Sequence, residues 1–317
     1  MKLLVSELGA WSGYVSREFY FVMTDLMTNH GWRHIETYAL WSHPGAMRGK
    51  LLEMFGEVPE VILFWESYHF QLAHAYDITR LDCRKCLFAD DLHWRWGEEA
   101  RNKLLCYAMC DTILTPYAYV FNYFYPRLSS VKRVEWVPHS ASPDFMLGYN
   151  EQPENAVLLS GSLGRYYPLR ERMKRLHEER PHAVCYHPHP GYSCGYDYEN
   201  DGNVGRGYAA KIQSYRAGFT DSSQCRYVVA KYFEIPAVGA LLLADDAVSP
   251  QLKELGLVEY THYLPVSGDD LEEKVRYVLD ERNHAELDEI RRRGQEVVWE
   301  RHRTSDRARL IDEICAG

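Results

Sequence analysis

The sequence lacks any apolar run long enough to cross a membrane. Its longest runs, such as "VILFW" and "ALLLA", are far shorter than the roughly 20 residues that a membrane span needs. The first residues, "MKLLVSELGAWSG", also lack the long apolar core and the small-residue cleavage site of a signal peptide, and are typical of a first strand and its glycine turn. We therefore expect a soluble, cytoplasmic protein with no membrane span.

Excess positive charge is lacking as well. The 317 residues include 36 Lys and Arg against 45 Asp and Glu, which gives a formal net charge of −9 at pH 7. This balance argues against a protein that binds nucleic-acid backbones in general, although the stretch 165–180, "RYYPLRERMKRLHEER", supplies one basic helix. Nucleic acid is therefore an unexpected partner, and a salt-sensitive affinity for DNA would be its signature.

The eight cysteines do not form an ordered metal-ligand pattern. The pair in "CRKC" (Cys83, Cys86) and the later pair Cys106 and Cys110 loosely resemble zinc ligands. However, the second pair has helical spacing and a buried strand lies between the two pairs, whereas structural zinc pairs favour turns rich in Gly and polar residues. We expect reduced, partly buried thiols, no structural metal and no cofactor.

Three histidines, His182, His187 and His189, lie near Cys185 and Cys194 in the sequence. Prolines restrict the backbone of "YHPHPGY", so these histidines are poorly placed to chelate an ion together. We expect them to form part of a ligand-cleft wall, with a contact to a diphosphate as the alternative.

The sequence does contain a regular alternation of strand and helix patterns. Strand-like runs such as "KLLVSEL", "VILFW" and "AVLLSGS" are followed by helical periodicity, as in "SREFYFVMTDLMTNHG". This order predicts an α/β fold with mostly parallel sheets. The Pro-, Ser- and Asn-rich stretch 139–155 is typical of a linker, so we expect two domains, 1–145 and 146–317. A reductase is not expected, because "ELGAWSG" is not a GxGxxG turn.

The stretch "KYFEIPAVGALLLADD" (231–246) resembles the nucleotide-sugar signature of GT-B glycosyltransferases of the group 1 type, in which a Glu begins a helix and a strand leads to an acidic pair. Other pieces follow the family's order: "LLVSELGAWSGYV", "FADDLH", "VEWVPHSASPDF" and "LLSGSLGRYYPLR". The resemblance covers nearly the whole chain, and the order of the motifs is more specific than any one of them.

This resemblance implies two Rossmann-like domains facing a cleft, with an acceptor-side domain at 1–145 and a nucleotide-sugar domain at 146–317, whose last helices pack back on the first domain. It implies a hexosyl- or related transferase that moves a sugar from a nucleoside-diphosphate sugar, such as a UDP-sugar, to the hydroxyl of a glycan or small-molecule acceptor. It also implies that no bound metal assists the diphosphate. One departure matters: many retaining members carry a Glu where this chain has Arg226, so the anomeric outcome stays open.

The donor-binding candidates lie in the second domain. A carboxylate can accept hydrogen bonds from both ribose hydroxyls, which is the role that the resemblance implies for Glu234. The structural alternative is a carboxylate at the start of a helix that is stabilised by the helix dipole. The loop "GSLGR", with Gly161, Ser162 and Arg165, follows a strand and precedes a helix, so its N–H groups can approach a diphosphate. Arg165 can add a cation or be an ordinary solvated loop residue.

Three further residues complete the donor-side prediction. Arg226 and Lys231 are candidates for phosphate contacts and are equally compatible with surface charges. Gly239 ends the predicted helix and feeds the strand of the signature.

The acceptor-side candidates follow predicted strands of the first domain. Asp90, Asp91 and His93 in "FADDLH" are candidates for the base that deprotonates the acceptor hydroxyl. Neighbouring side chains of an extended segment alternate in direction, so one aspartate is expected to face the cleft, and both can instead cap the next helix. Glu66, directly after "VILFW", is a second candidate base.

Two other functions remain open from the sequence. A non-catalytic nucleotide- or glycan-binding protein with the same fold is favoured by the Arg226 departure. A glycosyltransferase that acts on modified DNA bases is the other, and the acidic composition weighs against it.

Overall fold

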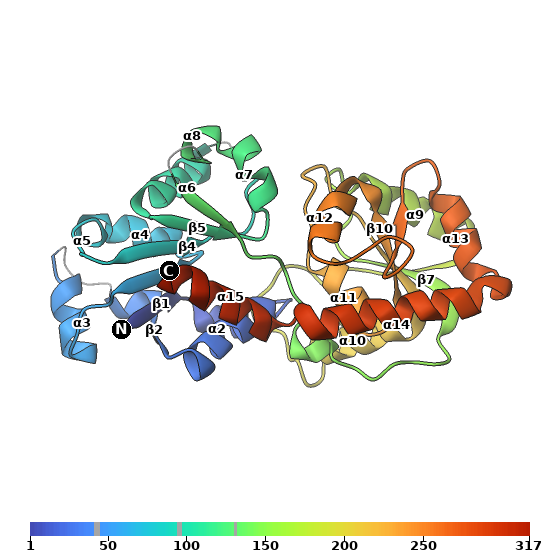
Figure 1. The fold of residues 1–317 in the computed structure, drawn as a ribbon, viewed down its shortest axis with the longest axis horizontal. Coiled ribbons are helices and arrows are strands. Elements are labelled where there is room, and N and C mark those ends of the chain that lie inside the picture. Colours follow the sequence, from blue (N-terminus) through green and yellow to red (C-terminus); the bar gives the residue numbers. More distant parts are fainter. Residues whose placement is uncertain (41–44, 94–96, 130–131) are drawn as a thin grey trace. The chain divides into compact units, whose positions relative to one another are not determined.

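The structure is a computed structural model that describes residues 1–40, 45–93, 97–129 and 132–317. The chain divides into two compact units (Figure 1). Unit 1 comprises residues 1–12, 19–138 and 305–317, and unit 2 comprises residues 13–18 and 139–304.

Unit 1 is built on a six-stranded parallel sheet with the order β2-β1-β3-β4-β5-β6. Its strands are β1 (Lys2–Ser6), β2 (Trp32–Glu36), β3 (Val61–Trp65), β4 (Arg84–Phe88), β5 (Thr112–Thr115) and β6 (Arg133–Trp136). All five residues of β3 are buried, which explains its continuous apolar run: a central parallel strand is covered on both faces.

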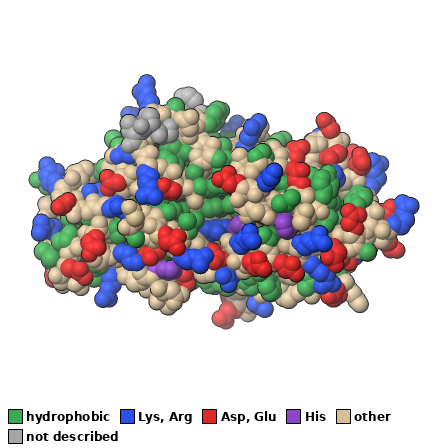
Figure 2. Space-filling view, in the orientation of Figure 1, with side chains coloured by type: hydrophobic (Ala, Val, Ile, Leu, Met, Phe, Trp, Pro, Cys, Tyr) green, Lys and Arg blue, Asp and Glu red, His purple; other side chains and the backbone are tan. Residues whose placement is uncertain are grey.

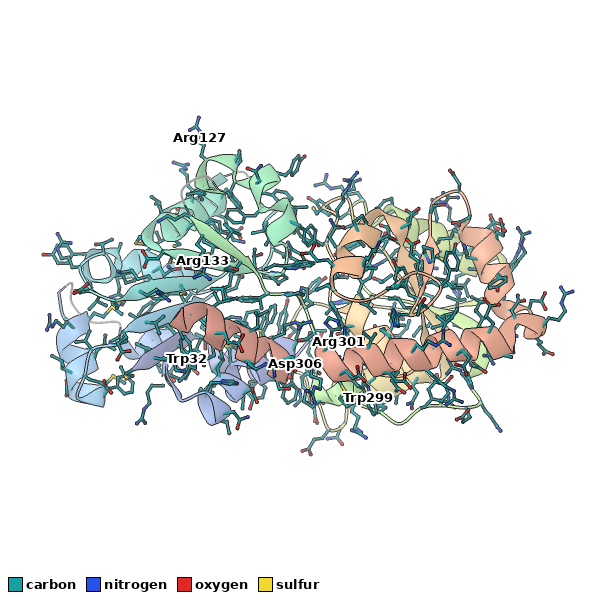
Figure 3. The ribbon with its side chains drawn as sticks, in the orientation of Figure 1. Trp32, Arg127, Arg133, Trp299, Arg301 and Asp306 are labelled. Carbon is teal, nitrogen blue, oxygen red and sulfur yellow. The ribbon has the colours of Figure 1, made fainter. Side chains whose placement is uncertain are left out.

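The helices of unit 1 follow its strands along the chain. They are α1 (Leu8–Ser12), α2 (Glu18–Asn29), α3 (Met47–Phe55), α4 (Tyr68–Ala73), α5 (Ala75–Ile78), α6 (Gly97–Met109), α7 (Ala118–Phe124), α8 (Pro126–Ser129) and α15 (Thr304–Ala316), with a 3₁₀ turn η1 (Thr37–Leu40). Apart from its first residue, α15 belongs to unit 1. Its Asp312 accepts a 2.7 Å hydrogen bond from the indole of Trp32, which Figure 3 labels.

Unit 2 is built on a five-stranded parallel sheet with the order β11-β10-β9-β7-β8. Its strands are β7 (Glu154–Ser160), β8 (Val184–His187), β9 (Tyr215–Thr220), β10 (Leu241–Asp245) and β11 (Leu264–Val266). Because these strands are parallel, their carboxyl ends meet at one edge, where open α/β sheets bind ligands.

The helices of unit 2 again alternate with the strands. They are α9 (Pro168–Glu179), α10 (Gly205–Gln213), α11 (Lys231–Ala237), α12 (Ser249–Glu254), α13 (Leu271–Leu279) and α14 (His284–Arg301), with 3₁₀ turns η2 (Pro143–Phe145), η3 (Asp246–Val248) and η4 (Glu281–Asn283). The long helix α14 runs along unit 2 (Figure 1). Its Trp299, labelled in Figure 3, donates a 2.8 Å hydrogen bond to the carbonyl of Ala237 at the end of α11.

Each unit has its own hydrophobic core. In unit 1 the core joins sheet residues such as Leu63 and Phe88 to Ile311 on α15. In unit 2 it joins Leu159 and Phe219 of the sheet to helical side chains. Two separate cores are the physical reason why the chain divides where it does.

None of the helices in the described part of the chain is both long and apolar enough to cross a membrane. All eight cysteines are free thiols. On the face drawn in Figure 2, acidic and basic side chains are interspersed.

Candidate functional site

Two cations of unit 2 converge on one glycine at the carboxyl end of β7. Gly161 has a φ of 99°, and a Cβ added to it would lie 2.7 Å from Cε of Lys231 and 2.9 Å from Nη1 of Arg170. Both distances are below those of real Cβ contacts, so a side chain at this position would displace the ends of Lys231 and Arg170, and the positive φ itself favours glycine. The loop after β7 therefore brings glycine backbone and two long cationic side chains together at one point.

Arg170, near the start of α9, is fixed by a buried network. Its guanidinium donates to the carbonyl of Ser162 at 3.1 Å and to Oγ1 of Thr220 at 3.0 Å. Its Nε lies 3.1 Å from Oδ1 of Asp221, and both side chains of this ion pair are almost completely buried. The other oxygen of Asp221 accepts from the backbone N–H groups of Leu169 and Arg170, so one carboxylate caps α9 and orients the arginine.

Lys231, at the start of α11, is held by Tyr208 and Glu234. Its Nζ donates to the hydroxyl of Tyr208 at 2.8 Å and lies 3.7 Å from Oε2 of Glu234. The Tyr208 hydroxyl in turn lies 2.7 Å from Oγ of Ser160 at the end of β7. Burial lowers the pKa of Lys231, but Tyr208 and Glu234 raise it and the net shift is upward, so this side chain is a cation at neutral pH.

Glu234 is 6% exposed and lies one helical turn after Lys231. Burial raises the pKa of its carboxyl group, and the negative charge of Glu18 raises it further, whereas Lys231 and His139 lower it. A buried carboxylate beside a lysine can accept hydrogen bonds from two hydroxyl groups of a ligand.

His189, beyond the end of β8, is a neutral donor beside the two cations. Burial and the positive charges of Lys231 and Arg170 lower its pKa to about 4. Its Nδ1 accepts a 2.9 Å hydrogen bond from the backbone of Gly191, so its proton is on Nε2. This histidine can donate one hydrogen bond at neutral pH without adding charge.

The other predicted donor residues lie differently. Ser162 is in the loop, and its hydroxyl lies 2.7 Å from that of Tyr192. Arg165 is exposed and donates to the hydroxyl of Tyr166 at 3.4 Å, and Arg226 is an exposed turn residue with a φ of 56°. Gly239 is at the far end of α11, where a Cβ would meet the ring of Tyr149 at 2.9 Å. The structure thus brings Gly161, Ser162, Lys231 and Glu234 together and leaves Arg165, Arg226 and Gly239 outside that cluster.

The acceptor-side candidates form a cluster in unit 1, at the carboxyl ends of β3 and β4. Oε1 of Glu66 accepts hydrogen bonds of 2.8 Å from the backbone N–H of Asp90 and from the hydroxyl of Tyr68. Glu66 has a φ of 48°, which is unusual for a residue with a side chain. Asp91 is about half exposed, and its Oδ1 lies 3.6 Å from Nδ1 of His93. The turn after β4 is therefore anchored by Glu66 and presents Asp91 and His93.

Replacing Glu66 with Gln is expected to stabilise unit 1 increasingly as the pH rises. Burial holds the pKa of Glu66 above its ordinary value, with Lys103 opposing the shift. The folded protein therefore binds the proton of Glu66 more tightly than the unfolded chain does. This difference stabilises the folded wild type at low pH, and the stabilisation is lost as the pH rises through the raised pKa of Glu66. Gln keeps an oxygen for both hydrogen bonds and carries no charge.

Unfolding temperatures of the wild type and of Glu66→Gln between about pH 4 and pH 8 check this trend. Glu66→Ala is the control, because it leaves the backbone N–H of Asp90 and the hydroxyl of Tyr68 without their acceptor. It should destabilise the protein at every pH, by about 1–3 kcal/mol for each donor. A Gln effect that does not change with pH would contradict the prediction.

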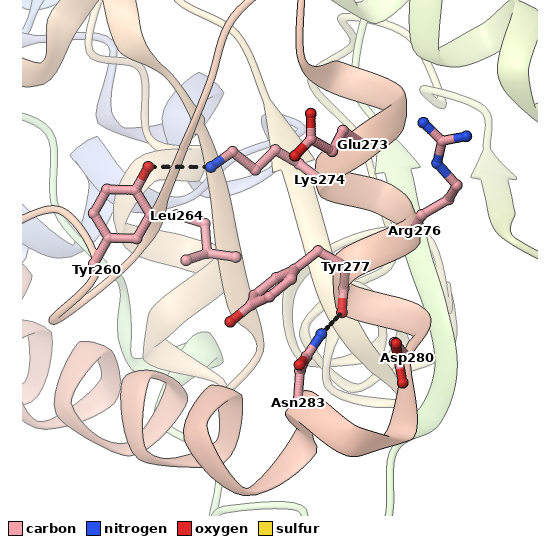
Figure 4. A pocket seen from close by; sticks show the side chains of 8 residues that line it. All are labelled: Tyr260, Leu264, Glu273, Lys274, Arg276, Tyr277, Asp280 and Asn283. Carbon is pink, nitrogen blue, oxygen red and sulfur yellow. Dashed lines mark hydrogen bonds between the residues drawn. The ribbon is translucent and has the colours of Figure 1, made fainter.

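A cavity of about 470 Å³ lies elsewhere in unit 2 (Figure 4). Its lining includes Tyr260, Leu264, Lys274, Tyr277 and Asn283. In it the amine of Lys274 donates to the hydroxyl of Tyr260 at 3.1 Å. Within the described residues, no three His, Cys, Asp or Glu side chains lie close enough together to hold a metal ion.

Comparisons with known proteins agree with this geometry. Residues 168–313 match the family described as glycosyl transferase-like. The whole chain has the GT-B fold, and its residues 168–313 are similar to glycosyl transferases. The solved structures that follow supply the fold, with two Rossmann-like domains as predicted. No curated protein sequence matches the chain.

Solved structures resemble this chain over its whole length. A sucrose-phosphate synthase from Thermosynechococcus elongatus gives a TM-score of 0.65 at 11% identity, covering 99% of this chain and 97% of that one. An alpha-glucosyltransferase in complex with UDP and a 13-mer DNA containing an HMU base gives 0.62 at 10% identity, covering 100% of both chains. Anabaena HepE in complex with UDP gives 0.60 at 9% identity, covering 99% of both chains.

Sequence reasoning missed several residues that the fold brings to this cluster. Arg170 is in the quoted loop-and-helix motif, and its place near the start of α9, beside the glycine loop, is the signal that could have identified it. Tyr208 and Asp221 have no comparable signal, because each comes from a separate part of the chain and gains its neighbours only on folding.

Proposed function

We propose that this protein is a glycosyltransferase that transfers a sugar from a nucleoside-diphosphate sugar to an acceptor hydroxyl without a bound metal ion. The observation that carries the proposal is the convergence of Arg170 and Lys231 on Gly161. Two fixed cations and the bare backbone of a glycine provide the positive charge and the close approach that a diphosphate needs. They stabilise the nucleoside diphosphate as it leaves, which is the charge that a metal would otherwise compensate.

Three further groups fit this donor. Glu234 is suited to accept both ribose hydroxyls, as the resemblance of its surroundings to the family signature suggests. The Nε2–H of His189 is suited to a phosphate oxygen, because it lies beside Lys231 and Arg170 and is neutral. UDP is the donor nucleotide that we favour, since HepE and the alpha-glucosyltransferase are both seen with UDP.

For the acceptor we propose that Asp91 and His93 share the task of removing the hydroxyl proton. A carboxylate near an imidazole can orient it as a base, and the Asp91 side chain is accessible. Glu66 supports this turn through the backbone of Asp90 rather than reacting itself, because its Oε1 already accepts two hydrogen bonds.

Replacing Lys231 with Met is expected to weaken UDP binding by at least about tenfold, because one charge-assisted hydrogen bond is lost while the apolar stem remains. Unfolding temperatures with UDP, GDP, ADP, CDP and TDP, with and without magnesium, identify the nucleotide, and titration calorimetry gives the dissociation constants. The expected result is one nucleotide that stabilises the wild type independently of magnesium.

Lys274→Met is a closely matched control in the same unit. Lys274 also donates to a tyrosine hydroxyl and lies 3.8 Å from a carboxylate, that of Asp270, but it lines the separate cavity. It should leave nucleotide binding unchanged. Nucleotide stabilisation that is equal in both variants, or absent from the wild type, would overturn the proposal.

A modified DNA base is a second candidate acceptor, favoured by the alpha-glucosyltransferase that is seen with DNA. The net charge of −9 weighs against it. A salt-dependent affinity for duplex DNA in the presence of UDP would support this acceptor, and its absence at low salt would remove it.

A further inference from the structure

The cavity drawn in Figure 4 lies at the edge of the unit 2 sheet, away from the donor cluster. Its wall includes Leu264, the first residue of the edge strand β11. Three strand spacings separate β11 from β7, the strand before Gly161, which amounts to about 14 Å at about 4.8 Å each. The volume of about 470 Å³ is within the range of about 300–1,000 Å³ that is usual for ligand pockets. The cavity is therefore a second place in unit 2 where a small ligand fits.

Tyr260, in the loop before β11, has a backbone conformation that burial of its ring does not explain. Its φ is 58°, which costs energy in a residue with a side chain. The turn is fixed by a 2.7 Å hydrogen bond from the N–H of Tyr260 to the carbonyl of Tyr263. Nevertheless the side chain of Tyr260 is 56% exposed. The loop thus holds a large aromatic ring in solvent at the cavity, and strained residues of this kind are concentrated at ligand-binding sites.

Lys274, on α13, fixes the direction of this ring. Its Nζ donates to the hydroxyl of Tyr260 at 3.1 Å and lies 3.8 Å from Oδ2 of Asp270 (Figure 4). The ring of Tyr260 is therefore held at its hydroxyl end as well as through its backbone. A ligand that packs on a ring already held in place loses little binding free energy in ordering it.

Tyr277, one turn further along α13, supplies a second ring to the same wall. Its hydroxyl donates to Glu286 at 3.0 Å, and its carbonyl accepts from the side chain of Asn283 at 2.9 Å. In Figure 4 the side chain of Leu264 lies between those of Tyr260 and Tyr277. Two rings and a leucine give the cavity an apolar surface whose position is fixed from several sides.

The charges that line the cavity are balanced. Lys274 and Arg276 are cations, and Glu273 and Asp280 are carboxylates. This balance favours neither an anion, such as a nucleotide, nor a cation. Side chains that donate and side chains that accept hydrogen bonds are both present, which suits hydroxyl groups, because each hydroxyl does both.

A sugar ring has this combination of surfaces. Its hydroxyl groups project around the edge, and its faces carry C–H groups whose partial positive charge suits the negative face of an aromatic ring. We propose that this cavity is a second ligand site, which binds a neutral glycan on the rings of Tyr260 and Tyr277. The inference goes beyond the proposed function, and its evidence does not depend on the donor cluster. In a glycosyltransferase, such a site would retain a long acceptor through sugars that do not react.

The test titrates the protein with maltotriose, cellotriose and chitotriose as neutral probes and with trigalacturonate as an anionic probe of the same length. Ligand-observed NMR gives the dissociation constants. We expect at least one neutral trisaccharide to bind the wild type more tightly than trigalacturonate does. Tyr260→Gly should weaken that binding by at least about tenfold, because it removes the ring. Tyr260→Phe keeps the ring and should retain the affinity to within about threefold.

Tyr260→Gly also separates a ring that binds a ligand from one that stabilises the fold. Glycine adopts a φ of 58° without strain, so this variant should keep the unfolding temperature of the wild type. Its affinity for UDP should be unchanged as well. A marked fall in its unfolding temperature would show that the ring is structural and would overturn the inference.

Tyr76→Ala is the matched control. Tyr76 is also 56% exposed and has a cation beside its ring, with Cζ of Arg80 at 3.6 Å from the centroid, but it belongs to unit 1. It should leave glycan binding unchanged. The inference fails, and the proposed donor stands, if no neutral trisaccharide binds, if trigalacturonate binds more tightly, or if Tyr260→Gly and Tyr76→Ala have equal effects. A wild type that binds a glycan at Tyr260 but no nucleotide would overturn the proposed donor alone.

Discussion

Replacing Gly161 with alanine is expected to weaken UDP binding by at least about 100-fold, although it removes no polar atom. The added methyl group would lie 2.7 Å from Cε of Lys231 and 2.9 Å from Nη1 of Arg170, so both cations must move. Each loses a charge-assisted contact with the diphosphate, at roughly 1.5–3 kcal/mol per contact. The effect should exceed that of Lys231→Met, because one methyl group displaces two cations.

Gly164→Ala separates this steric effect from backbone strain. Gly164 lies in the same loop with a φ of 117°, so alanine there is also strained, but nothing lies within 4 Å of its added Cβ. Calorimetric titration of UDP into both variants should show strong loss for Gly161→Ala and a much smaller one for Gly164→Ala. Equal losses would mean that loop conformation, and not the position of the two cations, controls donor binding.

The architecture of this GT-B fold follows from local sequence patterns. The run "VILFW" predicts the buried strand that the structure has at Val61–Trp65, since only a strand covered on both faces can be apolar throughout. The joint at 231–246 likewise becomes a helix, a glycine with positive φ and a strand. Alternating strands and helices then leave few topologies besides parallel sheets.

The donor-side cluster could be predicted only in part. Gly161 and Lys231 belong to motifs whose residues stay close together after folding. Arg165 is predicted as a donor-binding residue because it follows the glycine loop directly, yet its side chain is exposed. Arg170 on α9 is instead the arginine that reaches Gly161, and it is 3% exposed. A side chain in the first turn of a helix points back toward the strand that precedes the helix. The sequence pattern does not show which of the two arginines lies at that position, because it does not fix the residue at which the helix begins.

The contact of Glu18 with His139 could not be predicted at all. Five of the six strands of the unit 1 sheet, β2 to β6, lie between these two residues in the sequence. The contact depends on how the segment 13–18 packs within unit 2, through backbone contacts such as that of Gly13 with Gly195. Such contacts carry no residue signature, because any sequence has the same backbone donors and acceptors.

Replacing Asp221 with alanine is expected to lower the free energy of unfolding of unit 2 by about 3–5 kcal/mol. Asp221 and Arg170 form an ion pair whose side chains are 1% and 3% exposed. Removing the carboxylate leaves a guanidinium with no counter-charge in a buried place, and two backbone donors at the start of α9 lose their acceptor. The cost is that of an uncompensated charge and not merely that of one lost contact.

Hydrogen exchange of the β7 and β9 amides measures this effect within unit 2, which matters because a chain of two units need not unfold in one step. Asp221→Asn keeps an oxygen for the two backbone donors and removes only the charge, so it should fall between the wild type and alanine. Glu178→Ala is the control: it breaks the exposed pair with Lys174 on the same helix, which is worth about 0.2–0.5 kcal/mol. If Asp221→Ala lowers the free energy of unfolding no more than Glu178→Ala does, then water must already reach Arg170. The proposed diphosphate site would then lack the low-dielectric surroundings that make its two cations effective.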